Sequence, residues 1–167
     1  MSGAMLGQHF LTSKKVVHNM CEAAHIETSD TVLEIGPGKG VLTEALLARA
    51  RKVIAIEKDP RLVALLKERF AQEIIEGRLS LHLADVRDVP LEELGLSRSP
   101  YLLIANIPYY LTGVILRRFF SERNKPQRAV LLLQKEVAER IAKSKKVSIL
   151  SQSVRAYGTP RLLEVVP

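Results

Sequence analysis

The sequence contains a single cysteine, Cys21, so a disulfide bond within the chain is impossible and we expect a reducing, cytoplasmic setting. Its longest apolar runs, such as AVLLL at 129–133, are far too short to cross a bilayer. The first residues lack a basic segment followed by a long apolar one, so we expect no secretion signal. With so few Cys and His residues, no spacing typical of metal ligands is present, and we expect no metal site.

Basic residues are concentrated in one part of the chain. Hydrophobic residues make up 47% of the 167 positions and charged residues 26%, as in one folded domain with its own core. Residues 1–110 carry 13 Lys and Arg against 14 Asp and Glu, whereas residues 111–167 carry 12 against 4. One-sided basic charge indicates a polyanionic partner, although a merely solvated surface explains the charge alone equally well.

Apolar segments alternate with helical patterns along nearly the whole chain. Continuous apolar runs predict strands at 31–35, 52–57, 79–83, 101–105, 128–133 and 161–166. Helical patterns lie at 13–26, 41–49, 59–70, 135–143 and 147–157, and a further helix begins at Thr112, its predicted cap. Residues 71–78 and 91–100 are predicted loops. This alternation predicts a doubly wound α/β fold with a parallel sheet, which binds ligands at the carboxyl ends of its strands.

Polar residues follow four of these strands at the end where a ligand binds. The first strand contains Glu34 and leads into the turn GPGKG at 36–40, and the next three are followed by Glu57, Asp85 and Asn106. Glycines let the backbone approach a ligand, but their spacing fits neither a dinucleotide fingerprint nor a phosphate-binding loop. Each feature also has a structural explanation: a tight turn, a charge at a helix start for Glu57, and a turn or cap for Asp85.

Taken together, the strand ends are typical of a site for an adenosine-bearing cofactor without a pyrophosphate. Glu57 lies 21 residues beyond Gly36, near the spacing at which an acid reaches the hydroxyl pair of a ribose. A carboxylate accepts two hydroxyl hydrogen bonds well, and Asp85 is suited to accept one from an adenine amino group. S-adenosylmethionine meets these requirements, so we expect it as the cofactor.

The turn NIPYY at 106–110 predicts chemistry on the exocyclic amine of adenine, whose lone pair is delocalised into the ring. Acceptors for both N–H groups favour a more pyramidal, more nucleophilic nitrogen, and the Asn106 side chain and nearby backbone carbonyls can supply them. Pro108 fixes the turn and Tyr109 can stack on the base, so we assign catalytic roles to Asn106, Pro108 and Tyr109. Such a base must be single-stranded or flipped from its stack. A strand-ending turn with packing tyrosines is the alternative, and we assign Tyr110 that structural role.

Four stretches resemble the KsgA/Erm family of ribosomal RNA adenine N6-dimethyltransferases: LGQHFL at 6–11, VLEIGPGKGVLTEAL at 32–46, ANIPYYLTGVIL at 105–116 and LLLQKEVAERI at 131–141. The resemblance implies a class I, Rossmann-like methyltransferase fold that uses S-adenosylmethionine. It also implies cofactor-binding roles for Gln8, His9, Leu11, Gly36, Gly38, Glu57, Asp85, Val86 and Asn106. Read without the family, His9 is a surface or core histidine and Leu11 is a core residue.

Within the family, QKEVAERI at 134–141 and VSILSQSVRAYG at 147–158 are more similar to the housekeeping small-subunit enzyme than to the antibiotic-resistance branch. That enzyme dimethylates two adjacent adenosines near the 3′ end of 16S rRNA. The resemblance implies the same reaction here, with ribosomal RNA or the immature small ribosomal subunit as the partner. We expect RNA contacts from Lys143, Lys145 and Lys146, and a monomer with no membrane partner.

The family continues beyond the point where this sequence stops. We expect residues 1–167 to form a single methyltransferase catalytic domain, with residues 1–12 as an N-terminal lid over the cofactor. The C-terminal strand and the helical RNA-binding domain are expected to be missing, which leaves the activity of the chain on RNA open. Three alternatives also stay open: an Erm-type 23S rRNA adenine methyltransferase, a non-catalytic rRNA-binding assembly factor, and a DNA adenine methyltransferase, which Ile107 disfavours.

Overall fold

Five parallel strands form one sheet in the computed structural model, which describes residues 13–143, 152, 154–155 and 158–166. The strands are β1 (Thr31–Ile35), β2 (Lys52–Glu57), β3 (Leu79–Leu83), β4 (Leu102–Asn106) and β5 (Arg128–Leu132). Their order across the sheet is β3-β2-β1-β4-β5, so β1 lies at the centre and the winding reverses after β3. This arrangement confirms the predicted doubly wound α/β sheet.

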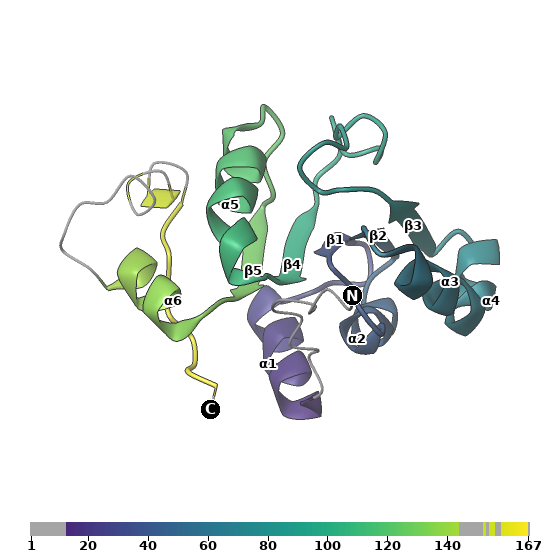
Figure 1. Cartoon of the computed structure of the whole chain (residues 1–167), viewed down its shortest axis with the longest axis horizontal. Helices are drawn as coiled ribbons and strands as arrows, with labels where there is room; N and C mark the ends of the chain where they lie inside the picture. The colour runs from purple at the N-terminus through teal and green to yellow at the C-terminus, as the bar shows by residue number, and fades with distance from the viewer. Residues whose placement is uncertain (1–12, 144–151, 153, 156–157, 167) are drawn as a thin grey trace, which may run out of the picture.

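Helices cover both faces of the sheet (Figure 1). They are α1 (Lys14–Ala24), α2 (Val41–Leu47), α3 (Pro60–Arg69), α4 (Ala71–Ile75), the 3-10 turn η1 (Tyr109–Leu111), α5 (Thr112–Ser121) and α6 (Lys135–Ala142). Successive strand residues face opposite layers: Val32 packs with α1 and α2, whereas Leu33 packs with α5 and the loop after β3. Both side chains are completely buried, as expected for strands covered on two faces.

Two helices begin at the residues that the sequence pattern predicts. The Ser13 hydroxyl accepts a hydrogen bond from the N–H of Val16 at 3.4 Å and caps α1. Asp59 caps α3 by accepting from the N–H of Arg61 at 2.9 Å, and Pro60 occupies the first helical position. The second cap matters for the site, because it fixes the chain immediately after Glu57.

The register of the sheet brings the strand ends into one row. The last residue of β1 pairs with the next-to-last residues of both β2 and β4. Gly36, which follows β1, therefore lies between Glu57 and Asn106. Its N–H donates to the carbonyl of Ile56 at 2.9 Å, which extends the ladder one step beyond the strand. This row forms the floor of the candidate site.

Three local predictions are wrong. Residues 71–78 contain the short helix α4, because the buried ring of Phe70 closes α3 and the chain turns straight into a new helix. Thr112 does not cap α5; it is already helical because η1 precedes it, and its hydroxyl has no hydrogen-bond partner among the described residues. Residues 161–166 have no regular secondary structure, since an apolar run becomes a strand only where a pairing partner exists.

The remaining connections agree with the sequence pattern where they are described. Residues 91–100 form the predicted loop, built from turns and bends. The helix predicted at 147–157 falls largely outside the described residues and stays a prediction. Among the residues that the structure describes, no helix has the length and apolar character needed to cross a membrane.

Candidate active site at the carboxyl ends of the strands

The glycine-rich turn after β1 needs its glycines for conformation and for space. Gly36, Gly38 and Gly40 have positive φ values of 67°, 60° and 83°, a region in which a side chain with a Cβ atom is strained. A Cβ atom on Gly40 would also stand 2.6 Å from the Phe70 ring. The turn leads from β1 into α2 and brings the N–H of Gly38 against the end of β2.

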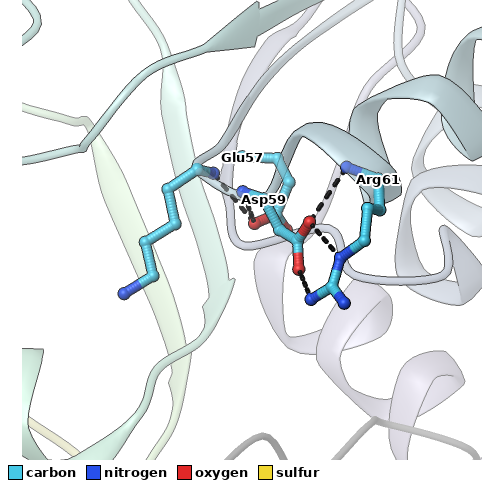
Figure 2. A network of polar contacts seen from close by, with 4 residues as sticks. Glu57, Asp59 and Arg61 are labelled. Carbon is cyan, nitrogen blue, oxygen red and sulfur yellow. Dashed lines mark hydrogen bonds and ion pairs between the residues drawn. The ribbon is translucent and has the colours of Figure 1, made fainter. Parts of the chain in front are cut away.

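Glu57 is held by three backbone N–H groups. Its Oε2 accepts a hydrogen bond from Gly38 at 3.2 Å, and its Oε1 accepts from Lys58 at 2.8 Å and Asp59 at 3.0 Å. In Figure 2, Glu57 lies beside Asp59, whose carboxylate binds Arg61 instead. A carboxylate has about four lone-pair sites, so Glu57 keeps acceptor capacity for a ligand hydroxyl although it is 4% exposed.

Glu34 is a buried carboxyl group just before the same turn. It is 1% exposed, its Oε2 accepts a hydrogen bond from the Thr43 hydroxyl at 2.7 Å, and its Oε1 has no partner within the described part of the chain. Burial raises the pKa of Glu34 to about 8; the Thr43 hydrogen bond opposes this shift and the nearby Glu57 charge adds to it. Glu34 is therefore mainly a neutral acid at pH 7.

Asp85, in the loop after β3, is paired with Arg87. The Arg87 Nη2 and Nε atoms lie 2.6 and 2.9 Å from the Asp85 carboxylate, and the backbone N–H of Arg87 donates to it at 2.9 Å. The hydrogen bonds from Arg87 lower the pKa of Asp85 to about 2. The loop is also tied to α5, because the Arg118 guanidinium donates to the carbonyls of Arg87 and Val89. Asp85 thus has the turn-closing role that was its structural explanation, and it also lines the cavity at the strand ends.

The NIPYY turn starts with an amide at the end of β4 and continues into η1. Ile107 is 4% exposed, and its N–H donates to the last carbonyl of β5 at 3.1 Å. Pro108 has φ −56° and ψ 140°, and its carbonyl accepts from the N–H of Leu111 at 3.0 Å. A Cβ atom on Gly36 would lie 3.9 Å from the Asn106 carbonyl oxygen. The glycine turn and the NIPYY turn are therefore direct neighbours.

A cavity of about 1170 Å³ unites these strand ends and continues along β5 toward α6 and residues 158–166. Its lining includes the following predicted site residues: Gly36, Gly38, Glu57, Asp85, Val86, Asn106 and Pro108. The geometry therefore brings the predicted cofactor residues of the first three strands together with the predicted catalytic turn. Their individual roles remain predictions.

The remaining predicted site residues are either outside the described part of the chain or away from the cavity lining. Gln8, His9, Leu11, Lys145 and Lys146 lie outside the described residues, as does the side chain of Tyr109. Lys143, at the end of α6, is exposed and lies 3.4 Å from a carboxylate oxygen of Glu139. It does not line the cavity.

Two residues that meet at the mouth of the cavity are Tyr110 and Lys58. The structural role expected for Tyr110 stays a prediction: the side chain is 49% exposed, lines the cavity, and its hydroxyl accepts a hydrogen bond from Lys58 Nζ at 3.3 Å. The overlooked residue, Lys58, carries no sequence signal, because its contact depends on the order of the strands. Burial of Glu34 does have a signal, since it is a lone acid inside an apolar strand.

A model of the ribosomal RNA adenine dimethylase family matches residues 4–167. This chain belongs to that family. The ribosomal RNA small subunit methyltransferase A of Dehalococcoides mccartyi is 46% identical over 163 residues, which cover 97% of this chain and 55% of the relative. The protein of the same name from a Synechococcus strain is 44% identical over 168 residues, covering 96% of this chain and 60% of the relative. The chain thus spans little more than half the length of these relatives.

Solved structures with related names share the fold of this dimethylase-family chain. A dimethyladenosine transferase from Plasmodium falciparum matches with a TM-score of 0.73 and 33% identity, covering 88% of this chain and 52% of that one. The 23S rRNA methyltransferase ErmE matches with a TM-score of 0.71 and 28% identity, covering 86% and 55%. The predicted class I, Rossmann-like methyltransferase fold and the resemblance to the KsgA/Erm family are confirmed.

Proposed function

We propose that this chain transfers methyl groups from S-adenosylmethionine to the exocyclic N6 of adenosines in ribosomal RNA. One observation carries the proposal: Gly36 stands between Glu57 and Asn106 in the row of strand ends that lines the cavity. A cofactor held on the Glu57 side and an adenine held on the Asn106 side meet over the glycine turn. This is the juxtaposition that methyl transfer to an adenine requires.

The residues beside the glycine turn fit S-adenosylmethionine. Glu57 is fixed by backbone N–H groups and keeps acceptor capacity for ribose hydroxyls. Asp85 is charged and can accept from the adenine amine when it shares its oxygens with Arg87. We propose that Gly36, Gly38 and Val86 complete this side, together with Gln8, His9 and Leu11 of the N-terminal segment. When bound, the cofactor supplies an electrophilic methyl group.

The NIPYY turn acts on the target amine. The Asn106 amide oxygen and the adjacent carbonyls accept hydrogen bonds from its N–H groups, which favours a pyramidal nitrogen with a localised lone pair. Pro108 holds those carbonyls in place because its ring fixes φ. Tyr109 stacks on the base and aligns the nitrogen with the methyl group. The nitrogen becomes acidic only after transfer, so no strong general base is needed.

The relatives favour the small ribosomal subunit as the source of the substrate. The chain is 46% identical to a protein named ribosomal RNA small subunit methyltransferase A, but 28% identical to a 23S rRNA methyltransferase. We therefore propose two adjacent adenosines near the 3′ end of 16S rRNA as the target, methylated in the cytoplasm by a monomer. In this proposal, residues 1–167 are one catalytic domain with residues 1–12 over the cofactor, and Lys143, Lys145 and Lys146 contact RNA.

Transfer of a labelled methyl group to immature small ribosomal subunits tests this function. Asn106→Ala should lower the transfer rate about 100- to 1000-fold, the usual cost of one positioned hydrogen-bonding group. Asn19→Ala is the matched control, because Asn19 lies on α1 and bonds Glu164 outside the strand-end row. A folded wild type that binds this RNA yet transfers no methyl would favour the assembly-factor alternative. Preferential methylation of a DNA hairpin would favour a DNA enzyme.

A further inference from the structure

The mouth of the cavity carries a link between two strands that are not neighbours. Lys58 follows β2 and Tyr110 follows β4, while β1 lies between them. Adjacent strands lie about 4.8 Å apart, so these two ends are separated by about 10 Å. The Lys58 and Tyr110 side chains together bridge that distance. Its Nζ donates to the Tyr110 hydroxyl at 3.3 Å and lies 5.7 Å from the centre of the ring.

Lys58 differs from nearby cations in the chemistry of its partner. Arg61, Arg69 and Arg87 each pair with a carboxylate, at 2.7, 2.8 and 2.6 Å. Within the described part of the chain, no acid lies within ion-pair distance of Lys58, although its charge contributes, after the hydrogen bonds from Arg87, to the lowered pKa of Asp85. Its hydrogen-bond acceptor is the Tyr110 hydroxyl. An ammonium has three N–H donors, so the bond to Tyr110 leaves donors for another partner. The tyrosine ring adds an attraction that holds the charge in place without neutralising it.

A target base that enters this cavity leaves its sugar–phosphate backbone at the mouth. Reaction at the amine requires the base to leave its stack, and the base enters while attached to its ribose. The phosphates on either side of that ribose then lie at the rim, where Lys58 and Tyr110 stand. We propose that the Lys58 ammonium, positioned by Tyr110, binds the backbone phosphate next to the target adenosine. This inference rests on the proposed function and names a phosphate ligand on the cofactor side of the site.

The first test measures how binding to an RNA hairpin with two adjacent loop adenosines depends on salt, with S-adenosylhomocysteine at saturation. Lys58→Met should weaken binding several-fold and reduce the slope of log affinity against log salt by about 0.7, the value for one single-strand phosphate contact. Lys67→Met is the matched control, because Lys67 is an exposed lysine on α3 outside the cavity lining. Lys58→Arg should restore the slope. Equal behaviour of Lys58→Met and Lys67→Met would overturn the proposal.

A second test asks whether the partner is one phosphate of the RNA. A neutral methylphosphonate linkage beside the target adenosine should weaken binding by wild type but cause no further loss in Lys58→Met. The same linkage several nucleotides away should weaken both proteins equally. If the adjacent linkage weakens wild type and Lys58→Met to the same extent, Lys58 binds no phosphate there.

The role of Tyr110 is tested by Tyr110→Phe, which removes the hydroxyl and keeps the ring. This variant should show part of the Lys58→Met loss, and combining the two changes should add nothing to Lys58→Met alone. Full additivity would show that Tyr110 does not act through Lys58. A wild type that binds the cofactor by calorimetry but no RNA would overturn the proposed function together with this inference. Normal RNA binding that is insensitive to Lys58 would overturn the inference alone.

Discussion

The end of β2 and the end of β4 hold their functional groups by different means. At β2, the Glu57 carboxylate accepts hydrogen bonds from three backbone N–H groups, so its orientation is fixed before any ligand arrives. At β4, the shape of the turn comes from the ring of Pro108, the buried side chain of Ile107 and the closing hydrogen bond of η1. The proposed cofactor side is therefore organised by hydrogen bonds, and the proposed base side by covalent geometry and packing.

The balance of charged residues along the chain also changes at the end of the NIPYY turn. Residues 1–110 are close to neutral, whereas residues 111–167 carry 12 Lys and Arg against 4 Asp and Glu. A neutral half suits a small cofactor, and a basic half suits a polyanion. If this comparison is right, substitutions in the glycine turn and at Glu57 should disturb stability and cofactor affinity. Substitutions of basic residues within 111–167 should disturb RNA binding.

The largest effect on stability should come from Gly40→Ala. The added Cβ would stand 2.6 Å from the buried Phe70 ring, and the alanine would have to adopt the φ of 83° that Gly40 has. The free energy of unfolding should therefore fall by about 2–4 kcal/mol. Gly77→Ala is the control, because its φ is 73° but no atom lies within 4 Å of the added Cβ. Urea unfolding should show a loss of only about 1–2 kcal/mol for this control. Equal losses would mean that Phe70 moves aside at little cost.

The next largest effect should be the loss of cofactor affinity in Glu57→Gln. The amide cannot accept from Gly38, Lys58 and Asp59 together, and it lacks the charge that strengthens a bond to a ribose hydroxyl. One such hydrogen bond is worth about 1.5–3 kcal/mol, so titration calorimetry should show affinity for S-adenosylmethionine reduced about 10- to 100-fold. Glu44→Gln removes an exposed carboxylate that pairs with Arg69 and should leave the affinity unchanged. Unaltered affinity in Glu57→Gln would show that the Glu57 carboxylate does not bind the cofactor.

At a fixed pH the effect of Glu34→Gln should be smaller, and it should show mainly as a change in the pH dependence of stability. The pKa of Glu34 is raised from 4.5 to about 8, so the folded state binds more protons than the unfolded state between these values. Stability should therefore fall as pH rises from 5 to 8, by up to about 1.4 kcal/mol per pH unit. Glu34→Gln should flatten this part of the curve in urea unfolding at several pH values. Parallel curves for wild type and variant would show that Glu34 ionises normally.

The smallest effect should come from Lys143→Glu in the basic half. Lys143 is exposed, Glu139 is partly buried and the two lie 3.4 Å apart; such surface pairs contribute about 0–1 kcal/mol to stability. Unfolding should therefore change little. Binding to the RNA hairpin should weaken about twofold to threefold with a lower salt dependence, while cofactor affinity stays constant. No change in RNA binding would identify this end of α6 as a solvated surface.

The strands of the sheet could be predicted because each is an apolar run that two helical layers cover. Residues 161–166 have the same composition, yet Leu163 is 65% exposed and no strand forms there. Pairing is a long-range property that local composition does not contain. The helix α4 was missed for a related reason, since it depends on Phe70 packing into the core between two helices.

The positions of the site residues could be predicted from the order of strands, but their partners could not. Glu57 follows a strand at the right spacing, whereas its backbone donors come from a turn whose conformation needs three glycines at positive φ. The pairing of Asp85 with Arg87 joins residues that are two apart in the chain, so it could be predicted from the sequence. The Lys58–Tyr110 hydrogen bond could not be predicted, because it requires β1 to lie between β2 and β4.

The central position of β1 also sets the order in which strands can pair during synthesis. β2 follows β1 closely in the chain, but the other edge of β1 waits for β4, with Val32 pairing to Leu102. Until that strand leaves the ribosome, a mostly apolar strand keeps one edge unpaired, which is the kind of edge that joins other chains. Nascent chains shorter than about 100 residues should therefore be the ones that bind chaperones, and loop closure across this distance should limit the folding rate. Glu57 and Asn106 come to lie on either side of Gly36 only at that late step.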